Sequence, residues 1–317
     1  MHAEKIRIWF FGTPSLAATV LSAICEDARF EVCFAVTNPD KPFGRDQTMK
    51  ASPVKEMALK KHIPLYTPTK IRENHEFFEQ LWNHNCDYFI VVAYGKIVPQ
   101  ELLDIPKKMC INVHGSILPK HRGASPIQSA LIHWDRETGV TIMKMSLGMD
   151  EGDILKIRTI PIIPRETSGT LFEKFAQVSP WALIDTLLEL EHGGITSLPQ
   201  DHSSATYCKK IAKEDGCIDW NKSAQEIYHM WQAYTPWPGI YTVYEEKRLI
   251  LEQVTNYEWI ITNSGTIGEI TKLEDGMIWV ICGEWVLTLW QVKLEWKKSQ
   301  SIRDFLNGNQ KFIWYNF

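Results

Sequence analysis

Two different patterns of apolar and polar positions divide the chain. In the first half, apolar runs typical of strands occupy residues 6–11, 31–37, 88–93 and 110–113. Helical spacing follows the first run, with Ser15 as the expected N-cap, and returns at 53–61 and 126–134. Strands that alternate with helices predict an α/β fold with a mostly parallel sheet and helices on both faces.

The pattern changes after about residue 193. A long helix is expected from near Ser168 to the pair Gly193-Gly194, and residues 195–206 are rich in Ser, Thr, Pro and His with no period. Beyond them the sequence predicts one helix and then a series of short alternating strands, at 224–233, 240–244, 249–254, 266–270, 277–282 and 286–292. We therefore expect a first domain over 1–194, a linker over 195–206 and a small β-barrel or sandwich over 207–317.

Composition narrows the class of protein. The 317 residues suffice for about two domains, and the net charge of −4 argues against a nucleic-acid binder with an overall basic surface. The apolar runs are far shorter than the ~18 residues of a membrane span, and the N-terminus lacks a signal-peptide pattern, so a cytoplasmic protein without membrane association is expected. The seven cysteines form no CxxC pair, which favours reduced thiols and predicts no metal site.

The turn after the first strand does not fit dinucleotide binding. Gly12-Thr13-Pro14 stands where a phosphate-binding turn would, but Pro14 and Ala17 occupy positions that the GxGxxG pattern gives to glycine. A tight strand-to-helix turn is the better prediction, and a nicotinamide-dependent dehydrogenase is poorly supported.

The stretch CINVHGSILPKHRGASPIQ, residues 110–128, carries the first candidate chemistry. Asn112 and His114 are two residues apart, so on a strand they point to the same side, at the carboxyl end where open parallel sheets bind ligands. Asn supplies a donor for a developing oxyanion, and His exchanges protons near neutral pH. Taken alone, however, such a tripeptide is more often a pair of hydrogen-bonded loop residues.

A second stretch, TGVTIMKMSLGMDEGDIL at 138–155, predicts a strand, a glycine-flanked turn and another strand. A carboxylate in this turn would meet His114 across the strand ends and orient its ring. Spacing alone does not choose between Asp150 and Asp153, and either could be an ordinary turn aspartate.

Together, INVHGSILP, HRGASPIQ and the Asp150 turn resemble the catalytic core of the folate-dependent formyltransferases. The segments NPDKPFGR, ASPVK and TSGTLFEK, with YCKKIAKEDGCIDW and YTPWPG near the C-terminal end, resemble the members of that family that act on methionyl-tRNA. The resemblance covers nearly the whole chain. It implies a Rossmann-like formyltransferase domain followed by a C-terminal OB-like β-barrel domain.

The resemblance also implies a reaction. The donor would be 10-formyltetrahydrofolate and the acceptor the free amino group of methionyl-initiator tRNA, which would attack the formyl carbon directly without a metal. Asn112 would hold the oxyanion, His114 would assist proton movement, and Asp150 would fix His114. A monomer is expected.

Binding residues follow from the same resemblance. The folate segment of the family matches Ser116, Ile117, Leu118 and Pro119, where Ile117 is a mild departure, and Tyr94 and Gly95 would line the pterin pocket through backbone groups.

For tRNA, Arg45 matches an arginine that the family inserts near the acceptor stem, and the lysine cluster that includes Lys209 and Lys210 would contact phosphates. Residues 207–317 hold 12 Lys and Arg against 14 Asp and Glu, so RNA binding would have to use one face of this region.

Two alternatives remain at this point. A formyltransferase for an amino-sugar nucleotide would share Asn112, His114 and Asp150, but relatives of that type generally lack the C-terminal segments. A non-catalytic folate- or tRNA-binding homologue would not need the complete Asn, His and Asp set.

Overall fold

The computed structural model describes the chain except residues 1–3, 44–47, 83–84, 258–264 and 274–275. It forms two compact units. Unit 1 comprises Met1–Pro126, Glu137–Pro161 and Phe172–Lys209, and unit 2 comprises Ile127–Arg136, Ile162–Leu171 and Lys210–Phe317. Arg45, expected to contact tRNA, lies outside the described residues.

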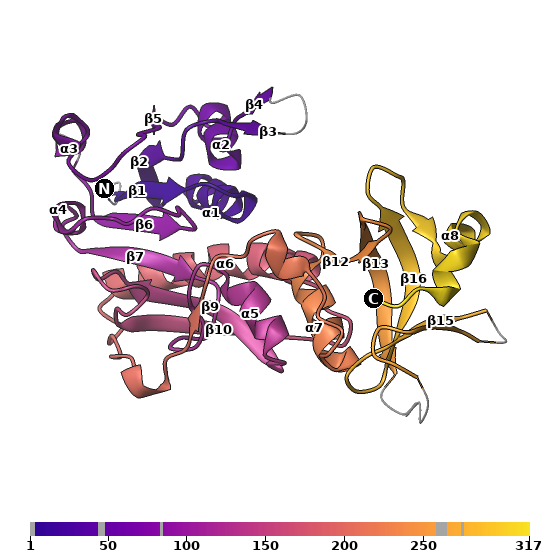
Figure 1. The fold of residues 1–317 in the computed structure, drawn as a ribbon. Coiled ribbons are helices and arrows are strands. Elements are labelled where there is room, and N and C mark those ends of the chain that lie inside the picture. Colours follow the sequence, from indigo (N-terminus) through magenta and orange to yellow (C-terminus); the bar gives the residue numbers. More distant parts are fainter. Residues whose placement is uncertain (1–3, 44–47, 83–84, 258–264, 274–275) are drawn as a thin grey trace. The chain divides into compact units, whose positions relative to one another are not determined.

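Unit 1 is built on a seven-stranded sheet in the order β10-β9-β7-β6-β1-β2-β5 (Figure 1). Five strands are parallel, namely β1 (Ile6–Gly12), β2 (Phe30–Val36), β5 (Leu65–Tyr66), β6 (Tyr88–Val92) and β7 (Met109–His114). The strands β9 (Glu137–Lys144) and β10 (Ile154–Pro161) continue the sheet in antiparallel pairing. The predicted mostly parallel sheet is therefore confirmed, and its central strand β6 is apolar because both of its faces are buried.

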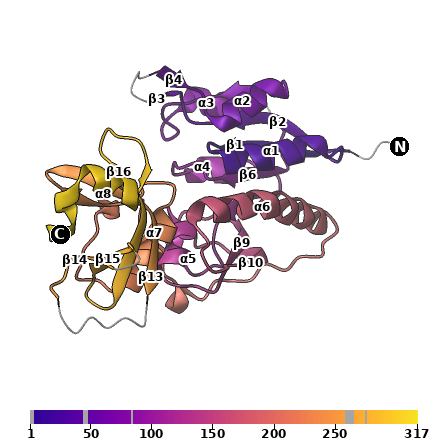
Figure 2. The same cartoon turned by 90° about the vertical axis from the view of Figure 1, so that its right-hand side faces the viewer.

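The helices of unit 1 lie against this sheet. Helix α1 (Ser15–Glu26) packs on β1, β2 and β6 and on α2 (Pro53–Lys60), as Figure 2 shows. The other helices are α3 (His75–Trp82), α4 (Gln100–Leu103) and α6 (Ser168–Glu191), whose first residues belong to unit 2. The predicted N-cap at Ser15 is wrong: Pro14 occupies that position without a side-chain hydrogen bond, and Ser15 is the first helical residue.

The polar segment 38–50 contains two short strands. Strands β3 (Lys41–Phe43) and β4 (Thr48–Lys50) form a short antiparallel hairpin, with Pro42 paired to Met49. A two-stranded hairpin accepts a proline more readily than a central strand does, because neither strand needs every backbone N–H for a ladder.

Unit 2 contains an antiparallel sheet in the order β12-β13-β16-β15-β14, with β17 paired to β16. Its strands are β12 (Ile240–Tyr244), β13 (Lys247–Tyr257), β14 (Ile270–Lys272), β15 (Ile278–Ile281), β16 (Val286–Leu294) and β17 (Gln300–Ser301). Its helices are α5 (Pro126–Ile132), which begins at the last residue of a unit 1 segment, α7 (Ala224–Tyr234) and α8 (Ile302–Gly308). The expected antiparallel β domain at the C-terminal end is confirmed.

One predicted strand of unit 2, at 266–270, is wrong. The Glu269 carboxylate accepts a hydrogen bond from the Thr266 N–H at 2.8 Å, and Gly268 has a φ of +84°. This local bond holds residues 266–269 in a turn, and the strand β14 begins only at Ile270.

The carboxyl ends of the parallel strands carry the turns of interest. At the end of β1, a Cβ on Gly12 would lie 2.6 Å from the Ala17 Cβ and 2.9 Å from the Val92 carbonyl oxygen. Only glycine fits there, so the predicted tight turn is confirmed. The neighbouring segments are joined by hydrogen bonds, because Asn38 Nδ2 donates to Thr13 Oγ1 and to the Tyr94 carbonyl at 2.9 and 2.8 Å.

Candidate active site

Two polar side chains leave the end of strand β7 on the same side. Asn112 pairs with Val91 of β6 and Met143 of β9 in the sheet, and His114 is the last residue of the strand, 5% exposed. The alternation of a strand directs both side chains toward the connection between β9 and β10.

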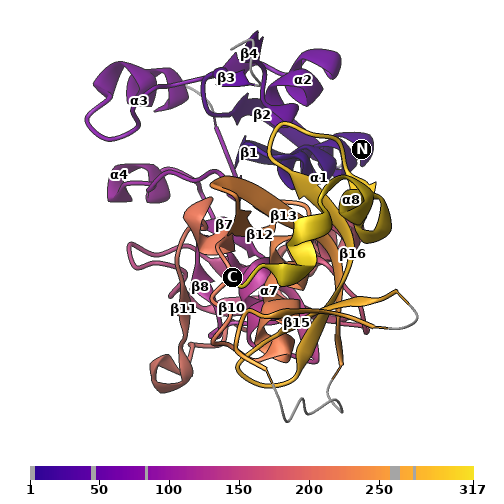
Figure 3. The same cartoon turned by 45° about the vertical axis from the view of Figure 1, so that its right-hand side comes forward.

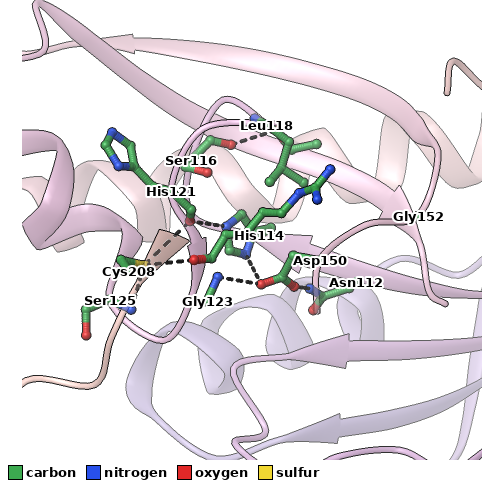
Figure 4. A network of polar contacts seen from close by, with 12 residues as sticks. Asn112, His114, Ser116, Leu118, His121, Gly123, Ser125, Asp150, Gly152 and Cys208 are labelled. Carbon is green, nitrogen blue, oxygen red and sulfur yellow. Dashed lines mark hydrogen bonds and ion pairs between the residues drawn. The ribbon is translucent and has the colours of Figure 1, made fainter. Parts of the chain in front are cut away.

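Asp150 comes from that connection and meets both of them (Figure 4). Its Oδ1 accepts a hydrogen bond from Asn112 Nδ2 at 3.2 Å, and its Oδ2 lies 3.6 Å from His114 Nδ1. Oδ2 also accepts the Gly123 N–H at 2.8 Å. Asp153, which the spacing left open, instead accepts Ser197 Oγ at 3.0 Å, so the structure places Asp150 and not Asp153 beside His114.

The hydrogen bonds assign the protons of His114. Its Nε2 lies 3.0 Å from the His121 carbonyl oxygen, which can only accept, so Nε2 carries a hydrogen. The nitrogen that faces Asp150 is therefore Nδ1, the one that gains or loses a proton. Nδ1 and Asp150 Oδ2 are thus the two atoms of this pair that face each other.

The loop after β7 is held by its own polar groups. Ser116 Oγ donates to the Lys120 carbonyl at 2.6 Å, and Thr141 Oγ1 donates to the Ser116 carbonyl while accepting the Leu118 N–H. Ser116 and Leu118 are buried, whereas Ile117 and Pro119 are half-buried. Of the four residues expected to bind folate, Ser116 and Leu118 thus form hydrogen bonds that hold this loop in its conformation.

In the turn after β6, Ala93 and Gly95 are exposed and the ring of Tyr94 is buried. Ala93 and Gly95 have φ angles of 46° and 75° and are exposed, while the Tyr94 ring lies edge-on against Phe11 at 5.4 Å in the core. Burial raises the pKa of the Tyr94 hydroxyl, which has no hydrogen-bond partner among the residues described. The backbone at Ala93 and Gly95 is therefore accessible at this strand end, while the Tyr94 ring is not.

Lys209 and Lys210 follow a short strand beside the site. Strand β11 (Tyr207–Cys208) pairs in parallel with β8 (Arg122–Gly123), whose glycine donates to Asp150 (Figure 3). Both lysines are exposed.

Three functional groups escaped the sequence analysis. The Gly123 N–H binds Asp150 directly, and Gln200 binds the carbonyl oxygens of Asp150 and Gly152. Arg122 is fully buried and donates to Gln200. A backbone N–H leaves no side-chain signal, and Gln200 stands 50 positions from Asp150 in a segment with no period.

Other features of the described residues bear on chemistry. All seven cysteines are free thiols. Within the described part of the chain, no group of three or more His, Cys, Asp and Glu is placed to hold a metal ion, and no helix has the length and apolar character to cross a membrane.

Comparison with known proteins gives a consistent family. The family described as Formyl transferase matches residues 4–187, and Formyl transferase, C-terminal domain, matches residues 210–310. The methionyl-tRNA formyltransferase of Pseudoalteromonas translucida is 39% identical over 98% of this chain and 96% of its own length. The enzyme of that name from Caldicellulosiruptor saccharolyticus is 40% identical over 95% of this chain and 96% of its own length.

Solved structures share the fold. An N-formyltransferase from Helicobacter canadensis, determined with folinic acid and dTDP-3-aminofucose, superposes with a TM-score of 0.66 at 18% identity. The match covers 90% of this chain and 98% of that one.

Proposed function

The chain belongs to the methionyl-tRNA formyltransferase family, and on that premise we propose that the site at the end of β7 transfers a formyl group from 10-formyltetrahydrofolate to the amino group of methionyl-initiator tRNA. One observation carries this assignment of the site: Asp150 joins Asn112 and His114 at the carboxyl end of a parallel strand. The relatives provide the reaction, and the geometry suggests which atoms perform it.

The reaction exchanges a formyl group for a proton. When bound, 10-formyltetrahydrofolate supplies an electrophilic formyl carbon on its N10. A bond forms from the acceptor amine nitrogen to that carbon, the bond from the carbon to N10 breaks, and one proton passes from the amine to N10. The protein has to stabilise negative charge on the formyl oxygen and to carry this proton.

Asn112 is suited to the first task. Its Nδ2 has two hydrogens, and one of them is directed to Asp150 Oδ1. This bond fixes the amide, so the second hydrogen is held in a constant direction for the formyl oxygen. A donor that is oriented before the reaction stabilises the developing charge without reorganisation.

His114 and Asp150 are suited to the second task. Because Nε2 is bonded to the His121 carbonyl, the pair accepts the proton of the attacking amine between Nδ1 and Oδ2. The same pair returns the proton to N10 as the carbon–nitrogen bond breaks. The Gly123 N–H holds Oδ2 in place throughout.

The exposed turn after β6 fits a folate ring. A Cβ built on Gly95 meets no atom within 4 Å among the described residues, and Ala93 and Gly95 are exposed. A flat heterocycle with ring N–H and carbonyl groups can pair with main-chain groups of this turn, with Ile117 and Pro119 on the adjacent loop. We assign Tyr94 and Gly95 to this contact, with Ser116 and Leu118 shaping the loop.

The tRNA would be held by cations and by the C-terminal region. Lys209 and Lys210 are exposed directly after β11, so phosphates near the acceptor end can reach them. We assign them and Arg45 to this role, with residues 207–317 as the tRNA-binding domain. Because Asn112, His114 and Asp150 come from one chain, a monomer suffices for the chemistry.

A formyl-transfer assay tests the proposal. The protein is mixed with 10-formyltetrahydrofolate and methionine-charged initiator tRNA, and parallel reactions contain charged elongator tRNA or an amino-sugar nucleotide. We expect formylation of the initiator tRNA and not of the sugar. Formylation of the sugar alone would retain the mechanism and refute the acceptor, whereas no transfer to any acceptor would refute the catalytic assignment.

A further inference from the structure

A buried polar network lies directly behind the Asp150 turn. Arg122 is 0% exposed and Gln200 is 6% exposed, and the two are joined by two hydrogen bonds, from Arg122 Nε and Nη2 to Gln200 Oε1 at 3.1 and 2.8 Å. Buried polar groups are costly unless they are bonded, so a network of this kind requires a reason.

The amide of Gln200 is bonded on both sides. While its oxygen accepts from Arg122, its Nε2 donates to the Asp150 carbonyl at 2.9 Å and to the Gly152 carbonyl at 2.7 Å. Arginine only donates and carbonyl oxygens only accept, so the amide has one possible orientation. Gln200 is therefore hydrogen-bonded to the main chain on both sides of Glu151.

The Asp150 turn needs such support. Asp150 has a φ of +54°, a left-handed conformation that costs a non-glycine residue free energy unless the surroundings maintain it. At Gly152 a Cβ would lie 1.9 Å from the Lys144 carbonyl oxygen, which shows how closely the turn returns to β9. Two bonds from one rigid amide hold this conformation.

Arg122 makes further contacts through Nη1, which is not bonded to Gln200. Its Nη1 donates to the Tyr207 hydroxyl at 3.1 Å and lies 3.6 Å from Glu151 Oε1. The main chain of the same residue donates to the Thr206 carbonyl, and the next residue, Gly123, donates to Asp150 Oδ2. Strand β8 therefore supports Asp150 twice, through the side chain of Arg122 and through the backbone of Gly123.

We propose that Gln200, held by Arg122, is a positioning residue that sets the Asp150 carboxylate against His114 and Asn112. This role rests on the proposed function of that site. Gln200 touches no reacting atom, so it acts on the rate of formyl transfer only through the geometry of the turn. A displacement of about 1 Å in a catalytic group lowers a rate by up to ~10²-fold.

The substitution Gln200→Glu separates this role from a general structural one. The glutamate retains an acceptor for Arg122, so the buried guanidinium keeps its partner, but it cannot donate to the Asp150 and Gly152 carbonyls. We expect kcat to fall on the order of 10²-fold, with KM for folate and for tRNA within about threefold of wild type. Gln177→Glu makes the same change at an exposed position of α6 and should leave kcat unchanged.

A double-mutant cycle completes the test. In an Asp150→Asn background, measured by single turnover with excess enzyme, Gln200→Glu should reduce the rate no further than about twofold, because both changes act at one carboxylate. If Gln200→Glu does not fold, Gln200→Met removes the donors without adding charge and should lower kcat about tenfold.

The outcomes are distinguishable. Wild-type kcat in Gln200→Glu, or a loss that multiplies fully with Asp150→Asn, would overturn the positioning role and leave the proposed function intact. Wild-type kcat in Asp150→Asn would overturn the catalytic assignment itself, and the role of Gln200 with it.

Discussion

The two units place their polar residues in different ways. In unit 1, Asp150 accepts a hydrogen bond from Asn112 and lies 3.6 Å from His114, whose other ring nitrogen is bonded to the His121 carbonyl. In unit 2 the tryptophans at 296 and 314 are 74% and 84% exposed, and most of the described charged residues lie on the surface. The activity of a site of the first kind depends on each of its groups. The affinity of a surface that binds through charge and stacking is instead a sum of many small contributions. Single substitutions should therefore have larger effects in unit 1.

The largest effect is expected at Asn112. Asn112→Ala removes the amide that we assign to the formyl oxygen, and kcat should fall by ~10²-fold or more, as it does when an oxyanion donor is lost. Folate affinity, measured by equilibrium binding, should be retained because the turn at 93–95 is untouched. Asn85→Ala, at an exposed position of unit 1, is the control. Near-normal turnover in Asn112→Ala would remove this residue from the mechanism.

A pair of glycines sharpens the comparison between the units. Cβ atoms would lie 1.9 Å from the Lys144 carbonyl oxygen at Gly152 and 2.0 Å from the Asn221 carbonyl oxygen at Gly283. Each change to alanine should lower the free energy of unfolding by about 1–3 kcal/mol, because backbone has to move. Among molecules that remain folded, only Gly152→Ala should also lower kcat, since Gly152 lies close to Asp150 in the same turn.

The measurements are urea unfolding and kcat corrected for the folded fraction. Gly308→Ala is the control, because a Cβ there meets no described atom within 4 Å, so it should lower neither the free energy of unfolding nor kcat. Equal losses of kcat in Gly152→Ala and Gly283→Ala would contradict the difference between the units.

The sequence predicted most of the fold of unit 1 because a parallel sheet has a simple pattern. Strands buried on both faces are mainly apolar, and β6 and β7 lie where apolar runs predicted them. The errors fall where local bonds decide the structure. Pro14 took the N-cap position expected for Ser15, and Glu269 turned the chain where a strand was expected.

The sequence predicted those parts of the site that consist of side chains close together in the sequence pattern. The spacing of Asn112 and His114 on one strand indicated a shared side, and a carboxylate from the next connection was expected beside them. Spacing alone did not choose between Asp150 and Asp153, because that choice depends on the three-dimensional path of a single turn, and only the family resemblance indicated Asp150. The contributions of Gly123 and Gln200 were inaccessible, because one is a backbone N–H and the other is distant in sequence.

A smaller effect is expected at the lysines after β11. Lys209→Ala with Lys210→Ala should raise KM for tRNA by about three- to tenfold and leave KM for folate unchanged. The slope of log affinity against log salt should decrease by about 1 for each phosphate that the protein no longer binds. Lys60→Ala with Lys70→Ala removes the same charge from two exposed positions elsewhere in the chain and is the matched control. Equal effects of the two pairs would show a general charge effect and reject a specific interaction.

Arg45→Ala probes the corresponding expectation for the segment between β3 and β4. It should weaken the use of tRNA more than the use of folate, measured as kcat/KM for each substrate. A parallel loss for both substrates would reject Arg45 as a contact to RNA.

The smallest effect concerns stability in unit 2. Burial lowers the pKa of His229, which lies against Trp134 with ring centroids 4.5 Å apart, from 6.5 to about 4. As the pH falls, His229 is therefore protonated in the unfolded chain before it is protonated in the folded one. Its contribution to the free energy of unfolding decreases from about pH 6.5 to about pH 4 and then stays constant. Because the ring is only half-buried, solvent screens part of this effect.

His229→Gln removes the titrating group, so urea midpoints followed from pH 7 to pH 4 should decrease less steeply than those of the wild type. His133→Gln, at an exposed histidine of the same unit, is the matched control for the loss of one imidazole. Parallel curves for the wild type and His229→Gln would mean that this ring keeps its proton equilibrium on folding. In that case the packing of His229 against Trp134 would leave its charge in contact with solvent, as at the exposed charged residues of unit 2.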